Sequence, residues 1–78
     1  MQQVALNGAE VWAYVVETGD GLRVRFSLDD WQRLNLGPGQ RVPVRLPGKD
    51  DVWLFVTGTT ELPPIVWVTM ARRVRVAG

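Results

Sequence analysis

The chain has 78 residues, which is enough for one small domain with a thin core. It contains no Cys and no His, and this excludes disulfides, Cys/His zinc sites, thiol nucleophiles and imidazole bases. The net charge is only +1, although eight of the nine basic residues are Arg, and hydrophobic residues make up 46% of the chain. That composition is typical of a folded domain rather than of a disordered chain.

Turn-forming residues recur along the chain about every 6–10 residues, and the runs between them are rich in Val, Trp, Tyr, Phe and Thr. This pattern predicts an all-β fold: a small, partly open barrel of five or six strands that takes up residues 1–78 as a single domain. Strands are expected near 10–17, 21–27, 41–46, 51–58 and 64–70, and 72–76 is the candidate for a sixth.

Two turns carry local signals. Gly19-Asp20-Gly21 can supply the positive φ of a tight hairpin, so the first two expected strands should pair antiparallel. Residues 46–49, Leu-Pro-Gly-Lys, have Pro and Gly at the two central positions of a type II turn and should join the third and fourth strands. Pro43 cannot donate a hydrogen bond, which indicates an edge strand or a bulge there.

One short helix is predicted at 28–35, before the Gly-Pro-Gly of residues 37–39. Ser27 can accept a hydrogen bond from the amide three residues on, and Asp29 and Asp30 suit the positive end of a helix. A helix of two turns depends on packing against the sheet. The side chains at helical spacing that would provide this packing are Leu28, Trp31 and Leu34.

The expected strands fall into two kinds. Strands 21–27 and 41–46 each have one apolar and one Arg-rich face, with Leu22, Val24, Phe26, Val42, Val44 and Leu46 on the apolar side. The other three strands are apolar on both faces. The interior of one small barrel cannot bury both faces of these three strands. The second apolar face is therefore covered either by the helix and chain ends or by another subunit or partner.

Residues 22–46 read LRVRFSLDDWQRLNLGPGQRVPVRL, and the informative parts are 24–27, 34–36 and 39–42. This segment resembles the strand–helix–strand element of AbrB-type (SpoVT/AbrB) swapped-hairpin proteins and, more widely, of the cradle-loop barrels. Asn35 stands where that family usually has Gly. The resemblance implies a barrel fold and arginines on a DNA-binding face, and those within the matched element are Arg23, Arg25 and Arg33.

The arginines are the first candidate binding residues, because Arg suits bidentate contacts to phosphate and guanine. If strands 21–27 and 41–46 are neighbours, their arginines form one patch, and the helix and C-terminal arginines extend it. The alternative is a solvated face with cross-strand salt bridges. The residues of this nucleic-acid hypothesis are Arg23, Arg25, Arg33, Arg41, Arg45, Arg72, Arg73 and Arg75.

The aromatic strands are the second candidate. Large rings on the second apolar face could anchor another protein, whereas Trp31 and Trp67 are predicted to lie in the core. The expected interface residues are Trp12, Tyr14, Trp53, Phe55, Val66 and Val68.

No catalytic residue, cofactor or metal site is predicted. The pair Asp29-Asp30 is explained by the start of the helix and the pair Asp50-Asp51 by a turn, and neither has a His or a metal-ligand cluster beside it. Residues 37–39 lack the features of a phosphate loop. Residues 1–16 show no signal-peptide pattern, and the apolar stretches 52–60 and 62–71 are about half the ~20 residues of a membrane helix, so a cytoplasmic location without membrane contact is expected.

The sequence thus favours a non-catalytic interaction or assembly module that self-associates or binds a partner protein through its Trp-rich strands. The alternative is a small AbrB-like DNA-binding regulator that uses its Arg-rich face.

Overall fold

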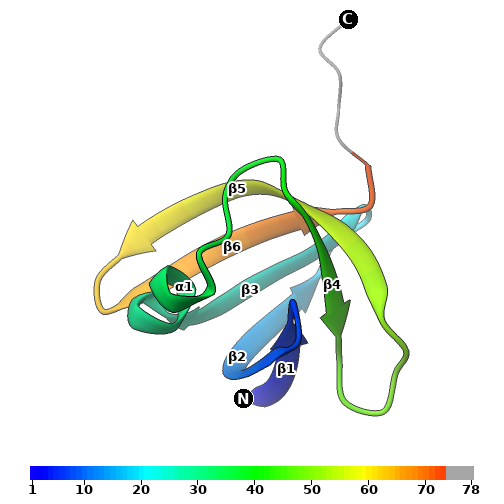
Figure 1. Cartoon of the computed structure of the whole chain (residues 1–78), viewed down its shortest axis with the longest axis horizontal. Helices are drawn as coiled ribbons and strands as arrows, with labels where there is room; N and C mark the ends of the chain where they lie inside the picture. The colour runs from blue at the N-terminus through cyan, green and yellow to red at the C-terminus, as the bar shows by residue number, and fades with distance from the viewer. Residues whose placement is uncertain (74–78) are drawn as a thin grey trace, which may run out of the picture.

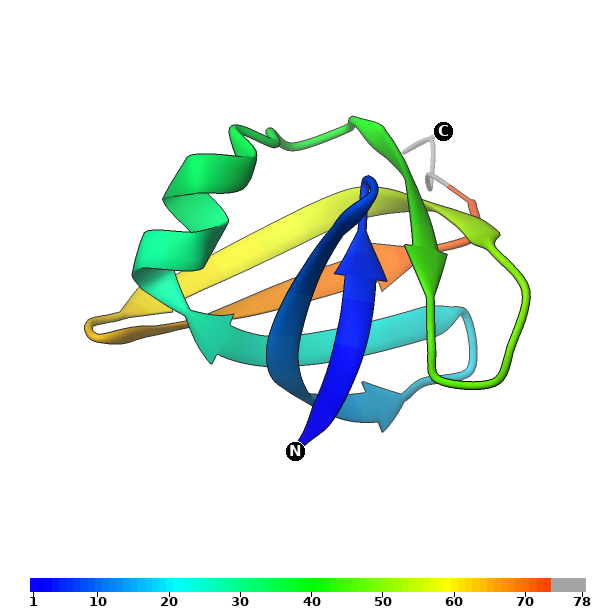
Figure 2. The ribbon, with the colours of Figure 1, turned by 60° about the horizontal axis from the view of Figure 1, so that its bottom comes forward.

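A computed structural model describes residues 1–73 of the chain. It contains six antiparallel strands and one helix, which close into a barrel with the strand order β1-β2-β3-β6-β5-β4 (Figures 1 and 2). The elements are β1 (Gln2–Leu6), β2 (Ala9–Glu17), β3 (Gly21–Ser27), α1 (Leu28–Leu34), β4 (Arg41–Arg45), β5 (Val52–Leu62) and β6 (Ile65–Ala71). The predicted all-β barrel with one short helix is confirmed, but the barrel is closed rather than partly open.

The sixth strand is β1, which the sequence analysis did not predict. It pairs with β2 through Leu6↔Ala9 and with β4 through Leu6↔Val44, and so closes the barrel. Asn7 and Gly8 form the two-residue loop to β2 with φ values of 52° and 84°. Positive φ at both positions is the requirement of a type I′ hairpin turn. The expected strand at 72–76 starts with a bend at Arg72 and Arg73, and 74–78 lie outside the described residues.

The hairpin of β2 and β3 is antiparallel as predicted, with Tyr14 opposite Arg25. The predicted reason for its glycines is wrong, because neither Gly19 nor Gly21 has a positive φ. Gly21 instead lies against β6, where a Cβ atom would come within 2.9 Å of Ala71 Cα and would overlap the carbonyl oxygen of Met70. Close contact between two backbones is therefore what requires glycine at this position.

The helix forms where its signals predict. The hydroxyl of Ser27 accepts a hydrogen bond from the Asp30 amide at 3.4 Å, and Asn35 ends the helix in the left-handed conformation, with φ 53° and ψ 41°. Asn tolerates this conformation better than most residues. The Trp31 ring packs edge-on against Phe26 at 6.1 Å between centroids, which seats the helix over the end of β3.

Replacing Ser27 by Ala is expected to lower the free energy of unfolding by about 1 kcal/mol, because the amide of Asp30 loses its acceptor. Ser27→Asp is the matched control, since a carboxylate also caps and suits the helix N-terminus. Urea denaturation followed by Trp fluorescence measures both. Equal losses in the two variants would show that Ser27 contributes through something other than the cap.

The turn at residues 46–49 is confirmed: the Lys49 amide donates to the Leu46 carbonyl at 3.1 Å, and Gly48 has φ 74°. The prediction for Pro43 is wrong, because β4 is paired on both sides, with β5 and with β1. Pro43 lies just past the short pairing with β1, and there its carbonyl accepts from the Asn7 amide at 2.9 Å. The barrel thus accommodates a proline where one of the two pairings of β4 ends.

The interior is built from alternate residues of all six strands, closed by the helix. In β3 and β4 the buried faces are those predicted. In β6 the expectation is wrong: Val66 and Val68 are 0% and 1% exposed and belong to the core, while Trp67 points outward and is half-buried. The other core residues include Val4, Leu6, Val11, Ala13, Leu22, Val24, Phe26, Leu28, Trp31, Leu36, Val42, Val44, Leu54, Val56 and Met70.

Candidate functional site

The exposed aromatic residues lie on opposite sides of the barrel. β2 and β5 are three strands apart in both directions around the closed order, whether through β3 and β6 or through β1 and β4. Trp12 and Tyr14 on β2 are 60% and 44% exposed, and Trp53 on β5 is 50% exposed. The predicted interface is therefore split in two, and Val66 and Val68 are absent from both halves because they are buried.

The predicted arginine patch is split in the same way. β3 carries Arg23 and Arg25, and β4 carries Arg41 and Arg45, and these two strands are also three apart in both directions. The prediction of one four-arginine patch is wrong. Of the remaining candidates, Arg33 forms an ion pair with Asp30 on the helix at 3.5 Å, Arg72 and Arg73 follow β6 at the barrel end, and Arg75 lies outside the described residues.

Each side of the barrel nevertheless combines arginine with aromatic rings. On one side, here called the Tyr14–Trp67 face, the outward side chains of β2, β3 and β6 include Trp12, Tyr14, Arg23, Arg25 and Trp67. The guanidinium of Arg25 lies 4.3 Å from the centre of the Tyr14 ring and 5.7 Å from that of Trp67, and Arg23 lies 4.9 Å from Trp67. Cross-strand pairing of Tyr14, Arg25 and Trp67 produces this row.

The charge of the Tyr14–Trp67 face is not neutralised. Within residues 1–73, the ion pairs involve Arg33, Arg45 and Lys49, but not Arg23 or Arg25. The outward positions from Trp12 to the end of β2, and those of β3 and β6, carry no carboxylate. The two guanidinium groups are thus held in place by rings rather than by acids.

A shallow groove of about 570 Å³ opens beside this face. It runs between β2, the start of α1 and the β5–β6 turn. Its walls include Trp12, Tyr14, Arg25, Asp30, Pro64 and Ile65. The carboxylate of Asp30 is the acidic group at the groove, and it is paired with Arg33. A planar group placed in the groove would meet the exposed rings of β2.

The opposite side, here called the Trp53 face, consists of the outward residues Arg41, Pro43, Trp53 and Phe55. The guanidinium of Arg41 lies 4.8 Å from the centre of the Trp53 ring. Arg45, next along β4, is 4.0 Å from the carboxylate of Asp51. The centre of this face is therefore aromatic, with one cation stacked on it.

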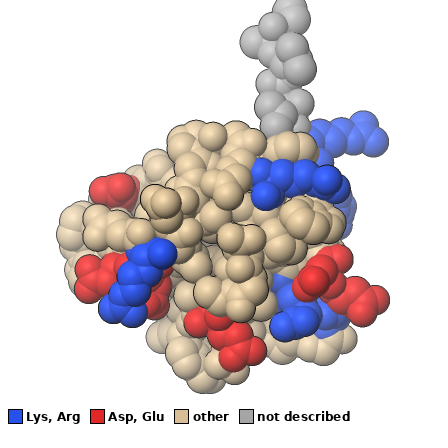
Figure 3. All heavy atoms as spheres, viewed as in Figure 1, with Lys and Arg blue, Asp and Glu red and all other residues tan. Residues whose placement is uncertain are grey.

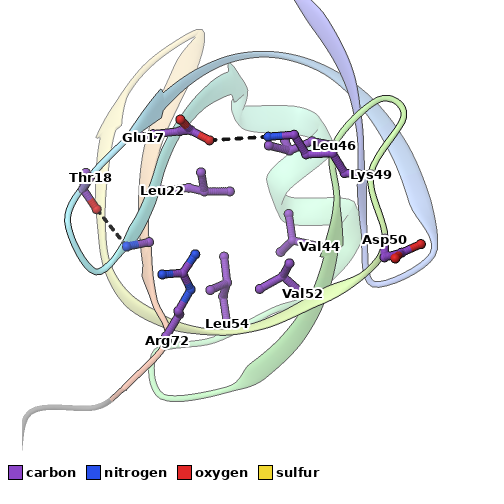
Figure 4. A pocket seen from close by; sticks show the side chains of 11 residues that line it. Glu17, Thr18, Leu22, Val44, Leu46, Lys49, Asp50, Val52, Leu54 and Arg72 are labelled. Atoms are coloured by element: carbon purple, nitrogen blue, oxygen red, sulfur yellow. Dashed lines mark hydrogen bonds and ion pairs between the residues drawn. The ribbon is translucent and has the colours of Figure 1, made fainter.

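A third feature is a cavity of about 310 Å³ at the end of the barrel away from the helix (Figure 4). Leu22, Val44 and Leu54 point into it, while Glu17 and Lys49 face each other across its mouth at 3.8 Å. The lining residues include two acidic side chains, Glu17 and Asp50, and two basic ones, Lys49 and Arg72, so the cavity favours neither an anion nor a cation.

The described residues hold no group of three or more acidic side chains close enough to share a metal ion. Figure 3 shows acidic and basic side chains in mixed groups around the edge of one face, with uncharged surface between them. No helix in residues 1–73 has the length and apolar character needed to cross a membrane.

Trp67 is the site residue that the sequence analysis misplaced. A signal was present, because Thr69 lies on the same side of β6 as Trp67, whereas Val66, Val68 and Met70 form an unbroken apolar series. A polar residue marks the outer face of a strand.

No protein-family model, no curated protein and no solved structure matches the chain. The resemblance of residues 22–46 to AbrB-type proteins remains a prediction. The function has to be inferred from the two aromatic faces themselves.

Proposed function

We propose that the chain is a non-catalytic assembly module that joins two copies of itself through the Trp53 face. The observation that carries the proposal is Trp53 itself, half exposed on the outside of a closed barrel and flanked by Phe55 and Pro43. A large ring in the middle of a partly apolar surface is the usual anchor of a protein interface.

The Trp53 face suits self-association better than the opposite side. In a two-fold contact each residue meets its own counterpart or a near neighbour. On the Tyr14–Trp67 face this would bring two unpaired arginines of each copy together, and like charges facing each other oppose binding. On the Trp53 face, Arg45 is already paired with Asp51, so each copy brings one unpaired arginine, Arg41, instead of two.

The area required is small compared with the molecule. A stable pair buries about 600 Å² or more from each copy. The accessible surface of the chain is 5205 Å², so about a ninth of it would suffice.

Sedimentation equilibrium tests the proposal. At about 100 µM the wild type is expected to sediment at twice its 8.8 kDa. Trp53→Glu is expected to sediment at 8.8 kDa, because the variant loses the ring that anchors the contact and would have to desolvate a carboxylate in its place. Trp12→Glu is the matched control, since Trp12 is an even more exposed tryptophan on the other side and its replacement should leave the pair intact.

Two results would contradict the proposal. One is a wild type that stays monomeric at the highest concentration. The other is dissociation by Trp12→Glu with no effect of Trp53→Glu, which would assign the contact to the opposite face.

A further inference from the structure

We infer that the Tyr14–Trp67 face binds single-stranded nucleic acid, with Arg23 and Arg25 contacting phosphates and the rings of Trp12, Tyr14 and Trp67 stacking on bases. This inference goes beyond the proposed assembly function and concerns the opposite side of the barrel. It rests on the row of guanidinium groups and rings across β2, β3 and β6 and on the groove beside it.

The charges on this face favour an anionic ligand. Arg23 and Arg25 are the charged groups at the outward positions of β3, and neither takes part in an ion pair within residues 1–73. Cation–π contacts with Tyr14 and Trp67 hold the two guanidinium groups in place without neutralising them. A phosphate that binds there need not displace a carboxylate first.

The rings favour a ligand that also has flat, apolar faces. Trp12 is 60% exposed and lies two residues from Tyr14 on the same side of β2. Every base has a π-face, so aromatic rings bind single strands with little sequence preference. Bases can also stack on the plane of an arginine guanidinium, and Arg25 presents one between Tyr14 and Trp67.

The groove gives one base a defined place. It adjoins Trp12 and Tyr14, and Pro64 and Ile65 form its opposite wall. Its volume of about 570 Å³ exceeds what one planar ring system needs, and it is open to solvent along its length. A continuous strand can therefore lie across the face while one base enters the groove.

A double helix fits this face less well. In a duplex the base faces are covered by their neighbours, so exposed rings find nothing to stack on. Reading the major groove needs a projecting helix or a two-stranded ribbon. α1 has seven residues, and its Arg33 is paired with Asp30. The guanidinium groups of Arg23 and Arg25 lie within 4.9 Å of the centres of the Trp67 and Tyr14 rings, so they contact the barrel surface instead of projecting from it.

The test uses the full chain and a fluorescein-labelled oligothymidylate of about ten nucleotides, with anisotropy as readout. Binding is expected in the micromolar to 100 µM range at low salt, with a slope of log affinity against log salt near −1.4 for about two phosphates. Tyr14→Ala and Trp67→Ala are each expected to lower the affinity roughly 5- to 100-fold, as the loss of one stacked base predicts.

Two variants of one residue separate charge from stacking. Arg25→Gln should flatten the salt slope by about 0.7, the value for one phosphate on a single strand. Arg25→Lys should keep the slope but lower the affinity, because an ammonium group has no plane to stack. Thermal melts establish that each variant is folded, and Trp67→Phe, which retains a ring, should recover much of the binding lost in Trp67→Ala.

The opposite face supplies the matched control, because Arg41 stacks on Trp53 in the same way. Arg41→Gln and Trp53→Ala should bind the oligonucleotide like the wild type, even where they change the sedimentation. Binding that survives in a monomeric Trp53→Glu variant would show that the two proposals stand independently.

Four results would overturn the inference. The first is no binding at about 100 µM protein and low salt. The second is equal or tighter binding of a duplex of the same length. The third is an equal loss in the variants of the two faces, which would indicate diffuse attraction. The fourth is displacement of the oligonucleotide by polyglutamate at equal charge, which would indicate an acidic protein partner.

Discussion

Replacing Val66 by Glu is expected to abolish the cooperative fold. Val66 is fully buried in the core, where its register partner on β3 is the buried ring of Phe26. A buried carboxylate without a partner costs at least about 4 kcal/mol. The whole free energy of unfolding of 78 residues is about 4 to 12 kcal/mol, so the variant should be largely unfolded.

Thr69→Glu is the matched control on the same strand. Thr69 points outward and pairs with Arg23 on β3, so a carboxylate there meets solvent and a cation. Circular dichroism during heating should show a cooperative transition for Thr69→Glu and none for Val66→Glu. If Val66→Glu instead kept its fold and only changed its sedimentation, Val66 would face a partner, as the sequence first suggested.

The difference between these two positions shows what sequence patterning can and cannot decide. In β3 the residues beside Val24 are arginines, so alternation identifies the buried face. In β6 the residues beside Val66 are Ile65 and Trp67, which are also apolar. Hydrophobicity at the start of β6 therefore does not decide which face of the strand is buried, and the tertiary structure buries the face of Val66.

Local chemistry was a better guide than composition. Ser27 and Gly48 do what their positions in helix and turn signals predict. The Asn7-Gly8 pair carried an equally strong signal for a two-residue hairpin, and taking it into account would have placed a strand at Gln2–Leu6. The strand was missed because it is short and its first residues are polar.

The division into two faces could not be predicted, because it depends on strand order. β2 and β3 adjoin in both sequence and space, whereas β3 reaches β6 only after the helix and two further strands. That long-range pairing brings Trp67 to Arg25 and Tyr14, and it also separates Trp53 from them. The residue types show that arginines and aromatic rings are present, and only the topology divides them between two faces of the barrel.

The pairing of β3 with β6 also makes Gly21 one of the most sensitive positions in the chain. Gly21→Ala is expected to lower the free energy of unfolding by about 3 kcal/mol or more, at the upper end of overpacking effects. A Cβ there would lie 2.9 Å from the Cα of Ala71 and 3.0 Å from the carbonyl carbon of Met70. These are backbone atoms of β6, which cannot move aside as a flexible side chain would.

Gly19→Ala provides the control within the same hairpin. Nothing lies within 4 Å of a Cβ at Gly19, and its φ is not in the left-handed region. Alanine there should be neutral or stabilise by up to about 1 kcal/mol, since it restricts the unfolded chain. Guanidinium denaturation of the two variants measures the difference. A Gly21→Ala variant as stable as the wild type would mean that β3 and β6 do not approach each other closely at this end of the barrel. The contact between Arg23 and Trp67 would then lose the strand pairing that positions it.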